Sequence, residues 1–196
     1  MTDEGWRGYY EATAGRPPRK TLLWALDRFD AASPHRAVDL GCGDGRDTIE
    51  LLRRGWSVIA IDAEAIALER LKARPDLPPE AKLTTLCTKF EEAEWPEVAL
   101  VNASFALPSC PPALFPALWR KITDSLASGG RFAGQLYGNR DSWASNPGMT
   151  IFDREATRQL FAAYAIELFE EEESDAITPR GVAKHWHIFH IVARKR

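Results

Sequence analysis

Three closely spaced glycines lie between two aspartates in the first third of the chain, and these residue types suit the binding of a small ligand. The segment RAVDLGCGDGRDTIELLRRGWSVIAID spans residues 36–62. The three glycines are Gly41, Gly43 and Gly45. Asp39 precedes them, and Asp62 ends the next apolar run. Glycines let a ligand approach the backbone, and the start of a following helix offers unpaired N–H groups. The pattern predicts a ligand cradle between two carboxylates.

Two classes of ligand use such a loop. A dinucleotide site has the spacing G-x-G-x-x-G, with the pyrophosphate on the helix N-terminus. Here the third glycine comes one residue early, and Arg46 takes the last position of that pattern. S-adenosylmethionine has no phosphate, but it has an ammonium group and two ribose hydroxyls. Asp39 could receive the ammonium, directly or through water, and Asp62 could accept both hydroxyls. The spacing therefore favours S-adenosylmethionine over a dinucleotide.

The elements around this loop alternate between strands and helices. Apolar runs predict strands at 36–40, 56–62, 82–87, 97–105, 131–138, 165–173 and 184–195. Amphipathic stretches predict helices at 19–29, 46–55, 64–74, 112–130 and 153–164, the fourth of them stopped by glycines. This alternation indicates a parallel α/β sheet. The last two strands have too short a link for a parallel crossover, so we expect an antiparallel hairpin there.

The motifs in this order resemble those of the class I S-adenosylmethionine-dependent methyltransferases. AVDLGCGDG and VIAIDAE resemble the first two motifs, ALVNASFALP the end of the fourth strand, and LASGGRFAG the turn into the fifth. YYEATAGRPPRKTLLWAL and FAGQLYGNRDSWA are most similar to the small-molecule branch that includes the tellurite-resistance methyltransferases. The resemblance implies a Rossmann-like fold with a seven-stranded, mostly parallel sheet, an antiparallel last strand and helices on both faces. It also implies one domain over 1–196, with an N-terminal lid and first helix in 1–30.

The resemblance further implies S-adenosylmethionine as the cofactor and a set of residues that hold it. We expect the contacts to come from Asp39, Gly41, Cys42, Gly43, Gly45, Asp62, Ala63, Lys89, Phe90, Asn102, Ala103 and Ser104. For the adenine, the Lys89–Phe90 backbone would read the edge and the Phe90 ring would cover the face. Glu91 also competes for this role. The family's usual aspartate at the start of the fourth strand is replaced by Ala99, a position that is mostly structural.

The acceptor should lie outside the carboxyl ends of the strands. We expect Tyr10, Arg140, Asp141 and Trp143 to approach the transferred methyl group, with Tyr9 and Trp6 beside Tyr10 in the lid. Ser104 and Phe105 would form the floor, and Arg16 could bind an anionic acceptor or be a solvated surface group. Two structural alternatives to these acceptor-binding roles stay open. The N-terminal aromatic residues could pack on the edge of the core, and Arg140 and Asp141 could form a buried pair that fixes their loop.

Other features narrow the function further. His185 and His187 have the spacing of a metal pair, but no third ligand is evident, so we expect hydrogen-bonded strand histidines and no metal. The net charge of −3 and the lack of a basic stripe disfavour a nucleic-acid partner. No apolar run reaches the roughly 18 residues of a membrane helix. Three widely spaced cysteines fit a reducing cytoplasm.

These observations predict a cytoplasmic methyltransferase, monomeric or homodimeric, that acts on a small molecule. Because no convincing acid–base pair is evident, we expect a soft nucleophile such as a thiol or a chalcogen oxyanion. An oxygen or nitrogen acceptor would need a general base, and Asp141 or His185 could serve. Three other functions stay open. They are a non-catalytic S-adenosylmethionine-binding protein, an NAD-dependent oxidoreductase and a modifier of macromolecules.

Overall fold

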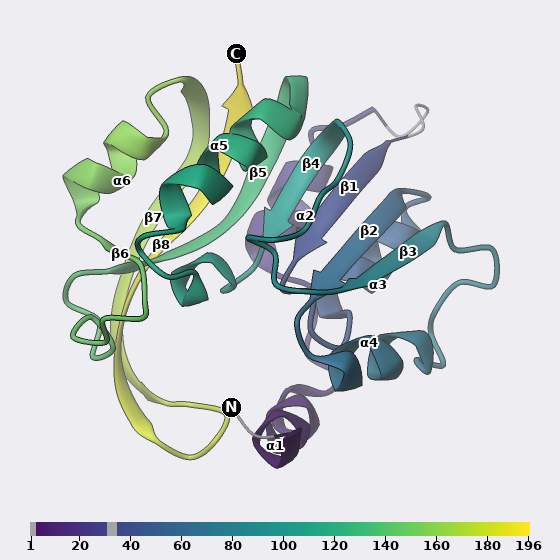
Figure 1. Ribbon diagram of the computed structural model, residues 1–196, viewed down its shortest axis with the longest axis horizontal. Coiled ribbons are helices and arrows are strands. Elements are labelled where there is room, and N and C mark those ends of the chain that lie inside the picture. The colour runs from purple at the N-terminus through teal and green to yellow at the C-terminus, as the bar shows by residue number, and fades with distance from the viewer. Residues whose placement is uncertain (1–2, 31–34) are drawn as a thin grey trace.

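The computed structural model describes residues 3–30 and 35–196, with side chains from residue 7 onward, and its centre is one twisted sheet (Figure 1). The strands are β1 (Arg36–Leu40), β2 (Ser57–Asp62), β3 (Leu83–Cys87), β4 (Val98–Ala103), β5 (Leu126–Gly138), β6 (Ile151–Phe152), β7 (Tyr164–Ile177) and β8 (Ala183–Lys195). Their order is β3-β2-β1-β4-β5-β8-β7, and the two-residue β6 pairs with β5. Strands β1 to β5 are parallel, and β8 is antiparallel to both neighbours. The predicted seven-stranded sheet with an antiparallel last strand is confirmed, and β6 is a short addition.

Helices cover both faces of this sheet. They are α1 (Asp3–Thr13), α2 (Lys20–Leu26), α3 (Arg46–Arg53), α4 (Ala65–Lys72), α5 (Phe115–Ser125), α6 (Arg154–Leu160) and the short 3-10 helix η1 (Leu107–Ser109). Neighbouring strand residues point to opposite faces. Val38 and Val101 pack in the cluster that includes residues of α5, whereas Ala37 and Leu100 pack in the cluster with α2, α3 and α4. In the described part of the chain, no helix has the length and apolar character needed to span a bilayer.

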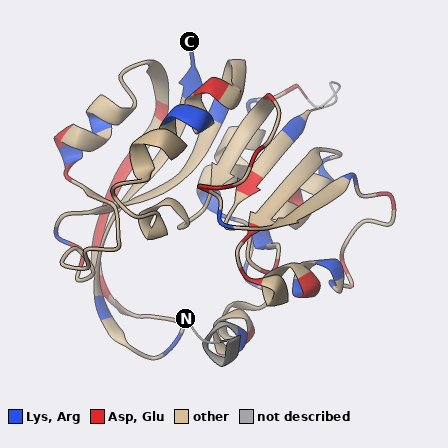
Figure 2. Cartoon of the chain, viewed as in Figure 1, with Lys and Arg blue, Asp and Glu red and all other residues tan. Residues whose placement is uncertain are grey.

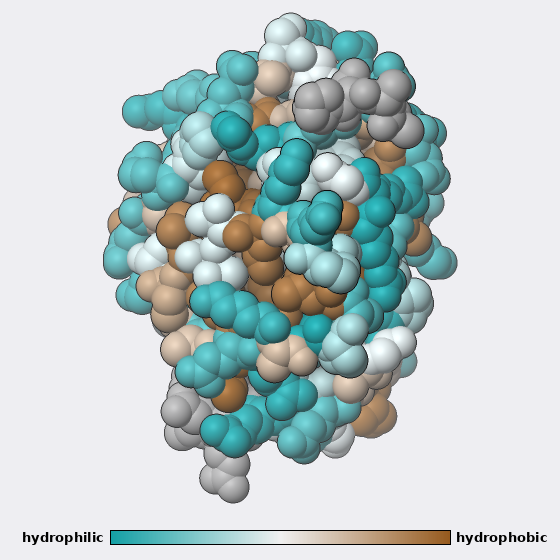
Figure 3. All heavy atoms as spheres, turned by 90° about the vertical axis from the view of Figure 1, so that its right-hand side faces the viewer, coloured by the Kyte–Doolittle hydropathy of each residue, from teal (hydrophilic) through white to brown (hydrophobic). Residues whose placement is uncertain are grey.

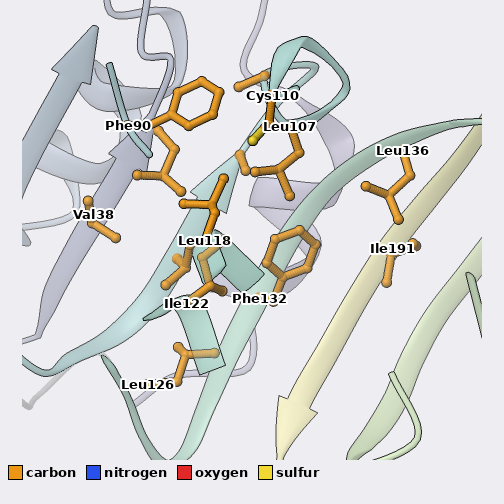
Figure 4. Close-up of a cluster of buried hydrophobic side chains, with 14 of the residues drawn as sticks. Val38, Phe90, Leu107, Cys110, Leu118, Ile122, Leu126, Phe132, Leu136 and Ile191 are labelled. Atoms are coloured by element: carbon orange, nitrogen blue, oxygen red, sulfur yellow. The ribbon is translucent and has the colours of Figure 1, made fainter. Parts of the chain in front are cut away.

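The larger core cluster lies between the sheet and α5 (Figure 4). Leu118 and Ile122 of α5 are one turn apart on the buried face, and each is at most 1% exposed. They pack in the same cluster as Phe132 of β5 and Val38 of β1. Each such side chain contributes about 1.5–3 kcal/mol through burial, so this layer fixes the strands whose carboxyl ends carry the site.

Strand β3 forms one of the two edges of the sheet. On the side of the molecule that includes this edge, Figure 3 shows apolar side chains gathered in the middle of the face with hydrophilic ones around them. Lys82 and Lys89 lie just beyond the two ends of β3, and both are exposed. Charged residues beside an edge strand oppose pairing with a further strand, so this edge is protected.

The end of α5 differs from the prediction. The expected glycine stop at 129–130 is wrong, because α5 ends at Ser125 and β5 begins with the buried Leu126. Leu126 pairs with Val98, after which the register between β4 and β5 shifts. A Cβ on Gly130 would lie 2.9 Å from a β4 carbonyl oxygen, so this glycine permits close strand approach at the shift.

A buried carboxylate on β1 connects three elements. The Asp39 side chain is 2% exposed, and its Oδ2 accepts a hydrogen bond of 2.6 Å from the Thr48 hydroxyl of α3. Its Oδ1 accepts a 2.8 Å bond from Asn102 Nδ2 of β4. Within the described part of the chain, Asp39 forms no ion pair. Burial, followed by the nearby Asp47, raises the Asp39 pKa to about 7.

A second buried carboxylate continues the network. Asp47 Oδ2 accepts bonds from the Ser104 hydroxyl at 2.6 Å and from Asn102 Nδ2 at 3.2 Å. Asp47 Oδ1 accepts the backbone N–H of Arg19 at 2.8 Å. We define the polar network as Asp39, Thr48, Asp47, Asn102 and Ser104. It joins β1, α3, β4 and the segment before α2, and so fixes the loop between β1 and α3.

We expect Asp39→Asn to change how stability depends on pH. The unfolded-state pKa is about 3.9, so between about pH 4 and pH 7 the folded state holds a proton that the unfolded state releases. The contribution of Asp39 to the free energy of unfolding therefore falls as pH rises through that window, by up to about 1.4 kcal/mol per pH unit. Asparagine cannot titrate, and its amide can bond Thr48 and Asn102.

Urea unfolding from pH 4.5 to 8.5 checks this expectation. As pH rises to about 7, the free energy of unfolding of wild type should fall relative to that of Asp39→Asn. Above about pH 7 the difference between the two should stay constant. Asp76→Asn is the control: arginine partners lower the pKa of that surface carboxyl, so the trend should not appear. A pH-independent difference for Asp39→Asn would contradict the raised pKa.

Candidate functional site

The glycine loop, residues 41–45, leaves a bare backbone at the carboxyl end of β1. Gly41 has φ +65°, and a Cβ there would lie 2.6 Å from the Cβ of Ala106. Gly45 has φ +87° and is the N-cap of α3, and a Cβ there would clash with Leu71 of α4. Both positions require glycine because of conformation and space. The predicted cradle is therefore present as a close backbone turn.

Asp62 is fixed beside the loop by two backbone bonds. Its Oδ2 accepts the N–H of Gly43 at 2.8 Å, and its Oδ1 accepts the N–H of Glu64 at 2.9 Å. Burial raises the pKa of this half-buried carboxyl, and the two backbone bonds oppose that rise. Each carboxylate oxygen has a further lone pair. A bare backbone beside a held carboxylate with spare acceptor capacity fits the amino-acid and ribose parts of S-adenosylmethionine.

Helix α1 reaches the same loop. The Tyr10 side chain is 2% exposed, and its Cε1 lies 3.4 Å from where a Cβ on Gly43 would be. Burial and the neighbouring Asp62 raise the Tyr10 pKa, so its phenol stays protonated. The Tyr9 ring meets Tyr10 edge-on at 5.7 Å between centroids. Tyr10 thus lies against the loop, whereas the side chain of Trp6 lies outside the described residues.

The other expected cofactor residues have different exposures. Asn102 and Ala103 are fully buried, and Asn102 belongs to the polar network, as does Asp39. These two polar groups support the loop from behind, and an ammonium contact by Asp39 stays a prediction. Cys42 is buried too, and burial raises its thiol pKa, which disfavours a nucleophilic role.

The loop after β3 comes near the glycine loop. Phe90 is 9% exposed, and its Cε1 lies 4.0 Å from where a Cβ on Gly41 would be. Lys89 and Ala63 are exposed, and Ala63 directly follows Asp62. The structure therefore brings Phe90 to the cradle, and the reading of adenine by this loop stays a prediction.

The structure separates Arg140 from Asp141. The Arg140 guanidinium is half exposed and bonds Glu173 at 2.7 Å and Glu171 at 3.0 Å. The Asp141 carboxylate is buried and pairs with Lys184, which also lies buried. The alternative of a buried Arg140–Asp141 pair is therefore wrong. Asp141 does fix its loop, through a lysine 43 residues away.

Three aromatic rings surround the Lys184 ammonium. Its Nζ lies 4.0 Å from the ring centroid of Trp143, 4.3 Å from Trp186 and 5.1 Å from Tyr137. Burial lowers the Lys184 pKa, and Asp141 opposes that shift. Cation–π contacts of this kind partly replace the lost hydration. We name these four residues the lysine cage. Trp143, predicted from sequence, forms its outer wall and is 43% exposed.

A wall of side chains connects the lysine cage with the start of α2. The Phe105 ring lies 6.2 Å from Tyr137 and 6.3 Å from His190, and the Arg19 guanidinium lies 4.4 Å from its centroid. Phe105 has φ +59°, and its N–H donates to Gln135 Oε1 at 3.1 Å. Sequence reasoning missed Arg19 and Tyr137. Tyr137 had a usable signal, because it closes the fifth strand at the end where ligands bind.

The histidines of β8 belong to an ion network with acidic β7, whose run of acidic residues is visible in Figure 2. His187 Nε2 lies 2.9 Å from Glu171, whose pKa falls to about 2 chiefly because of this contact. His185 contacts Glu173 and Asp175 at 3.1 and 2.8 Å. Among the side chains that the structure describes, no three or more histidines, cysteines or acidic residues are grouped so that they could hold a metal ion.

Comparison with known proteins agrees with this geometry. Residues 37–130 match a family model described as a methyltransferase domain. The trans-aconitate 2-methyltransferase of Rhodococcus jostii is 31% identical over 140 residues, which are 70% of this chain and 50% of the relative. An uncharacterised methyltransferase of Synechocystis is 31% identical over 65% of this chain and 58% of its own length. The chain thus spans about half the length of the curated relatives that it matches.

Solved structures show the same fold at low identity. TehB from Haemophilus influenzae has a TM-score of 0.77 at 13% identity and covers 97% of this chain and 67% of its own. The magnesium protoporphyrin IX methyltransferase of Synechocystis, solved with bound S-adenosylmethionine, has a TM-score of 0.72 at 13% identity, over 99% of this chain and 92% of its own. With the match of residues 37–130 to a methyltransferase domain model, they show that the chain has the fold of these methyltransferases.

Proposed function

We propose that this protein transfers the methyl group of S-adenosylmethionine to a small-molecule acceptor. The observation that carries the proposal is the bare glycine loop with Asp62 held beside it. The bound cofactor supplies a methyl group on a sulfonium: the electron pair of the acceptor forms a bond to the methyl carbon, and the pair of the broken carbon–sulfur bond returns to sulfur. The positive charge of the sulfonium is lost in this step, so a dry site favours it with an anionic acceptor.

The residues of the chain would bind, orient and exclude water. Asp62 would accept the two ribose hydroxyls, and Phe90 would cover the adenine. The glycine backbone would receive the amino-acid end, and Tyr10 would close over it. Holding both reactants in line accounts for most of the acceleration expected of such a site.

The acceptor would lie against Phe105, Tyr137 and Trp143. Asp141 would act as a positioning residue, because its carboxylate is paired with Lys184. His185 is engaged with two carboxylates at the hairpin. Neither is free to remove a proton, which supports an acceptor that needs no general base, such as a thiolate or an oxyanion. Relatives named for trans-aconitate and magnesium protoporphyrin IX support a small molecule as the acceptor class.

Three narrower expectations belong to this proposal. Residues 1–196 would form one domain, in which the segment before β1 acts as the lid. The protein would work in the cytoplasm, where its three free cysteines stay reduced. It would do so as a monomer or a homodimer.

A labelled-methyl assay tests the function. The protein is incubated with methyl-labelled S-adenosylmethionine and single members of a panel of thiols, carboxylic acids and inorganic oxyanions. We expect label in one acceptor class, with an equal amount of S-adenosylhomocysteine. Binding of S-adenosylhomocysteine without transfer to any member would instead favour a non-catalytic binding protein, and binding of NAD alone would favour an oxidoreductase.

We expect Asp62→Ala to weaken S-adenosylhomocysteine binding at least tenfold. The change removes two charge-assisted hydrogen bonds, each typically worth about 1.5–3 kcal/mol. Titration calorimetry measures the affinity, and Glu69→Ala on the exposed side of α4 is the matched control, with an expected change of less than twofold. An unchanged affinity for a folded Asp62→Ala protein would place the ribose elsewhere.

We expect Trp143→Ala to lower turnover at least tenfold and to leave the affinity for S-adenosylhomocysteine within about threefold. Its ring covers the Lys184 ammonium on the acceptor side and is distant in the sheet order from Asp62. The labelled-methyl assay and calorimetry measure the two quantities. Trp95→Ala, beside Ser125 of α5, is the control. A loss confined to cofactor affinity would remove Trp143 from the acceptor wall.

A further inference from the structure

Two arginines near the glycine loop, Arg19 and Arg46, form no ion pair with any described residue. The Arg46 Nε donates to the Pro17 carbonyl at 2.6 Å, but its Nη1 is buried and has no hydrogen-bond partner. The Arg19 guanidinium makes no hydrogen bond or ion pair with any residue that the structure describes, and its only assigned contact is the Phe105 ring at 4.4 Å. Arg16, by contrast, is exposed, and its guanidinium donates to the Ala12 carbonyl at 3.4 Å.

These cations lie in a partly dry environment. Burial is the main cause that lowers the pKa of both guanidinium groups, and Arg19 lowers that of Arg46 further. Two acids are nearby. Asp47 directs its hydrogen bonds to the Arg19 backbone N–H, the Ser104 hydroxyl and the Asn102 amide, and Asp44 interacts electrostatically with Arg46 but also with Arg74 and Arg70. Partly buried cations without a hydrogen-bonded anion are costly, so their presence points to a ligand that neutralises them.

Arg19 lies on the proposed acceptor side of the site, and Arg46 is near enough to Arg19 for the two charges to interact. Arg19 lies over Phe105, which follows β4, and the Phe105 ring meets Tyr137 of β5 and His190 of β8. Asp62 ends β2, on the opposite side of β1 from β4. The Asp62 carboxylate, which we propose binds the ribose, and the Arg19 guanidinium therefore lie on opposite sides of β1 in the strand order.

We propose that Arg19 and Arg46 bind a carboxylate or another oxyanion of the methyl acceptor, which makes the substrate an acidic small molecule. This inference rests on the proposed function, since it assigns the substrate class of the same site. The amino-acid end of the cofactor is a zwitterion whose single carboxylate is balanced by its own ammonium, so it does not neutralise two guanidinium groups. The planar fork of arginine suits a carboxylate or an inorganic oxyanion through paired hydrogen bonds.

Calorimetry on the full chain saturated with S-adenosylhomocysteine tests the proposal. The probes are succinate, tricarballylate and inorganic phosphate, with succinamide as the uncharged analogue. We expect at least one anion to bind and succinamide not to bind. Arg19→Gln and Arg46→Gln should each weaken that anion at least tenfold and leave the affinity for S-adenosylhomocysteine within about threefold. Arg53→Gln removes the same charge from the far end of α3 and should change neither affinity.

Several results would overturn the proposal. If the protein binds S-adenosylhomocysteine but none of the anions, the assignment of the two arginines to an anionic acceptor is wrong, and the methyltransferase proposal stands. If the glutamine variants lose S-adenosylhomocysteine but keep 5′-methylthioadenosine, which lacks the amino acid, the arginines hold the carboxylate of the cofactor. If wild type does not bind S-adenosylhomocysteine at all, the proposed function itself fails. Arg19→Lys, which keeps the charge without the fork, replaces Arg19→Gln if the latter does not fold.

Discussion

The arrangement of the site depends on two buried carboxylates that share neutral hydrogen-bond donors. Asp39 and Asp47 lie close together in the polar network, and the Asn102 amide donates to both. Placing two acids in the interior is costly, and the raised pKa of Asp39 reflects that cost. The cost is offset by the hydrogen bonds that Thr48 of α3, and Asn102 and Ser104 at the end of β4, donate to the two carboxylates. The network therefore fixes the start of α3 relative to β1 and β4, and with it the glycine loop.

A second buried charge independently organises the side of the site where we propose that the acceptor binds. The Lys184 ammonium is held by Asp141 and by the three aromatic rings of the lysine cage, and none of these residues belongs to the polar network. Removing one partner of such a pair leaves an uncompensated charge, which commonly costs about 3–5 kcal/mol. The loop after β5 is thus ordered by its own interaction. Cofactor side and acceptor side have separate supports that meet at Phe105 and Tyr137.

Local constraints were readable from the sequence, and contacts between distant residues were not. The glycine turn and the parallel strands were predicted because closely spaced glycines and short apolar runs leave direct traces in the sequence. The end of α5 was mispredicted, because pairing of Leu126 with Val98 outweighed the glycine signal that follows. Lys184 was missed because nothing near it in the chain indicates Asp141. The lack of partners for Arg19 and Arg46 is a property of their surroundings in space, which no motif records.

The left-handed backbone of Phe105 has a consequence for how this family of sites can diverge. A non-glycine residue at φ +59° costs of order 1–3 kcal/mol, and Gln135 holds it by accepting its N–H while donating to Thr21 of α2 at 2.9 Å. This side of the wall is rigid, because moving it would break two bonds in separate elements. New substrate shapes would have to be accommodated by substitutions on the opposite side, in residues 139–150, which connect β5 with β6. Evolutionary change in specificity should therefore concentrate in that loop, while Phe105, Gln135 and Thr21 vary together or not at all.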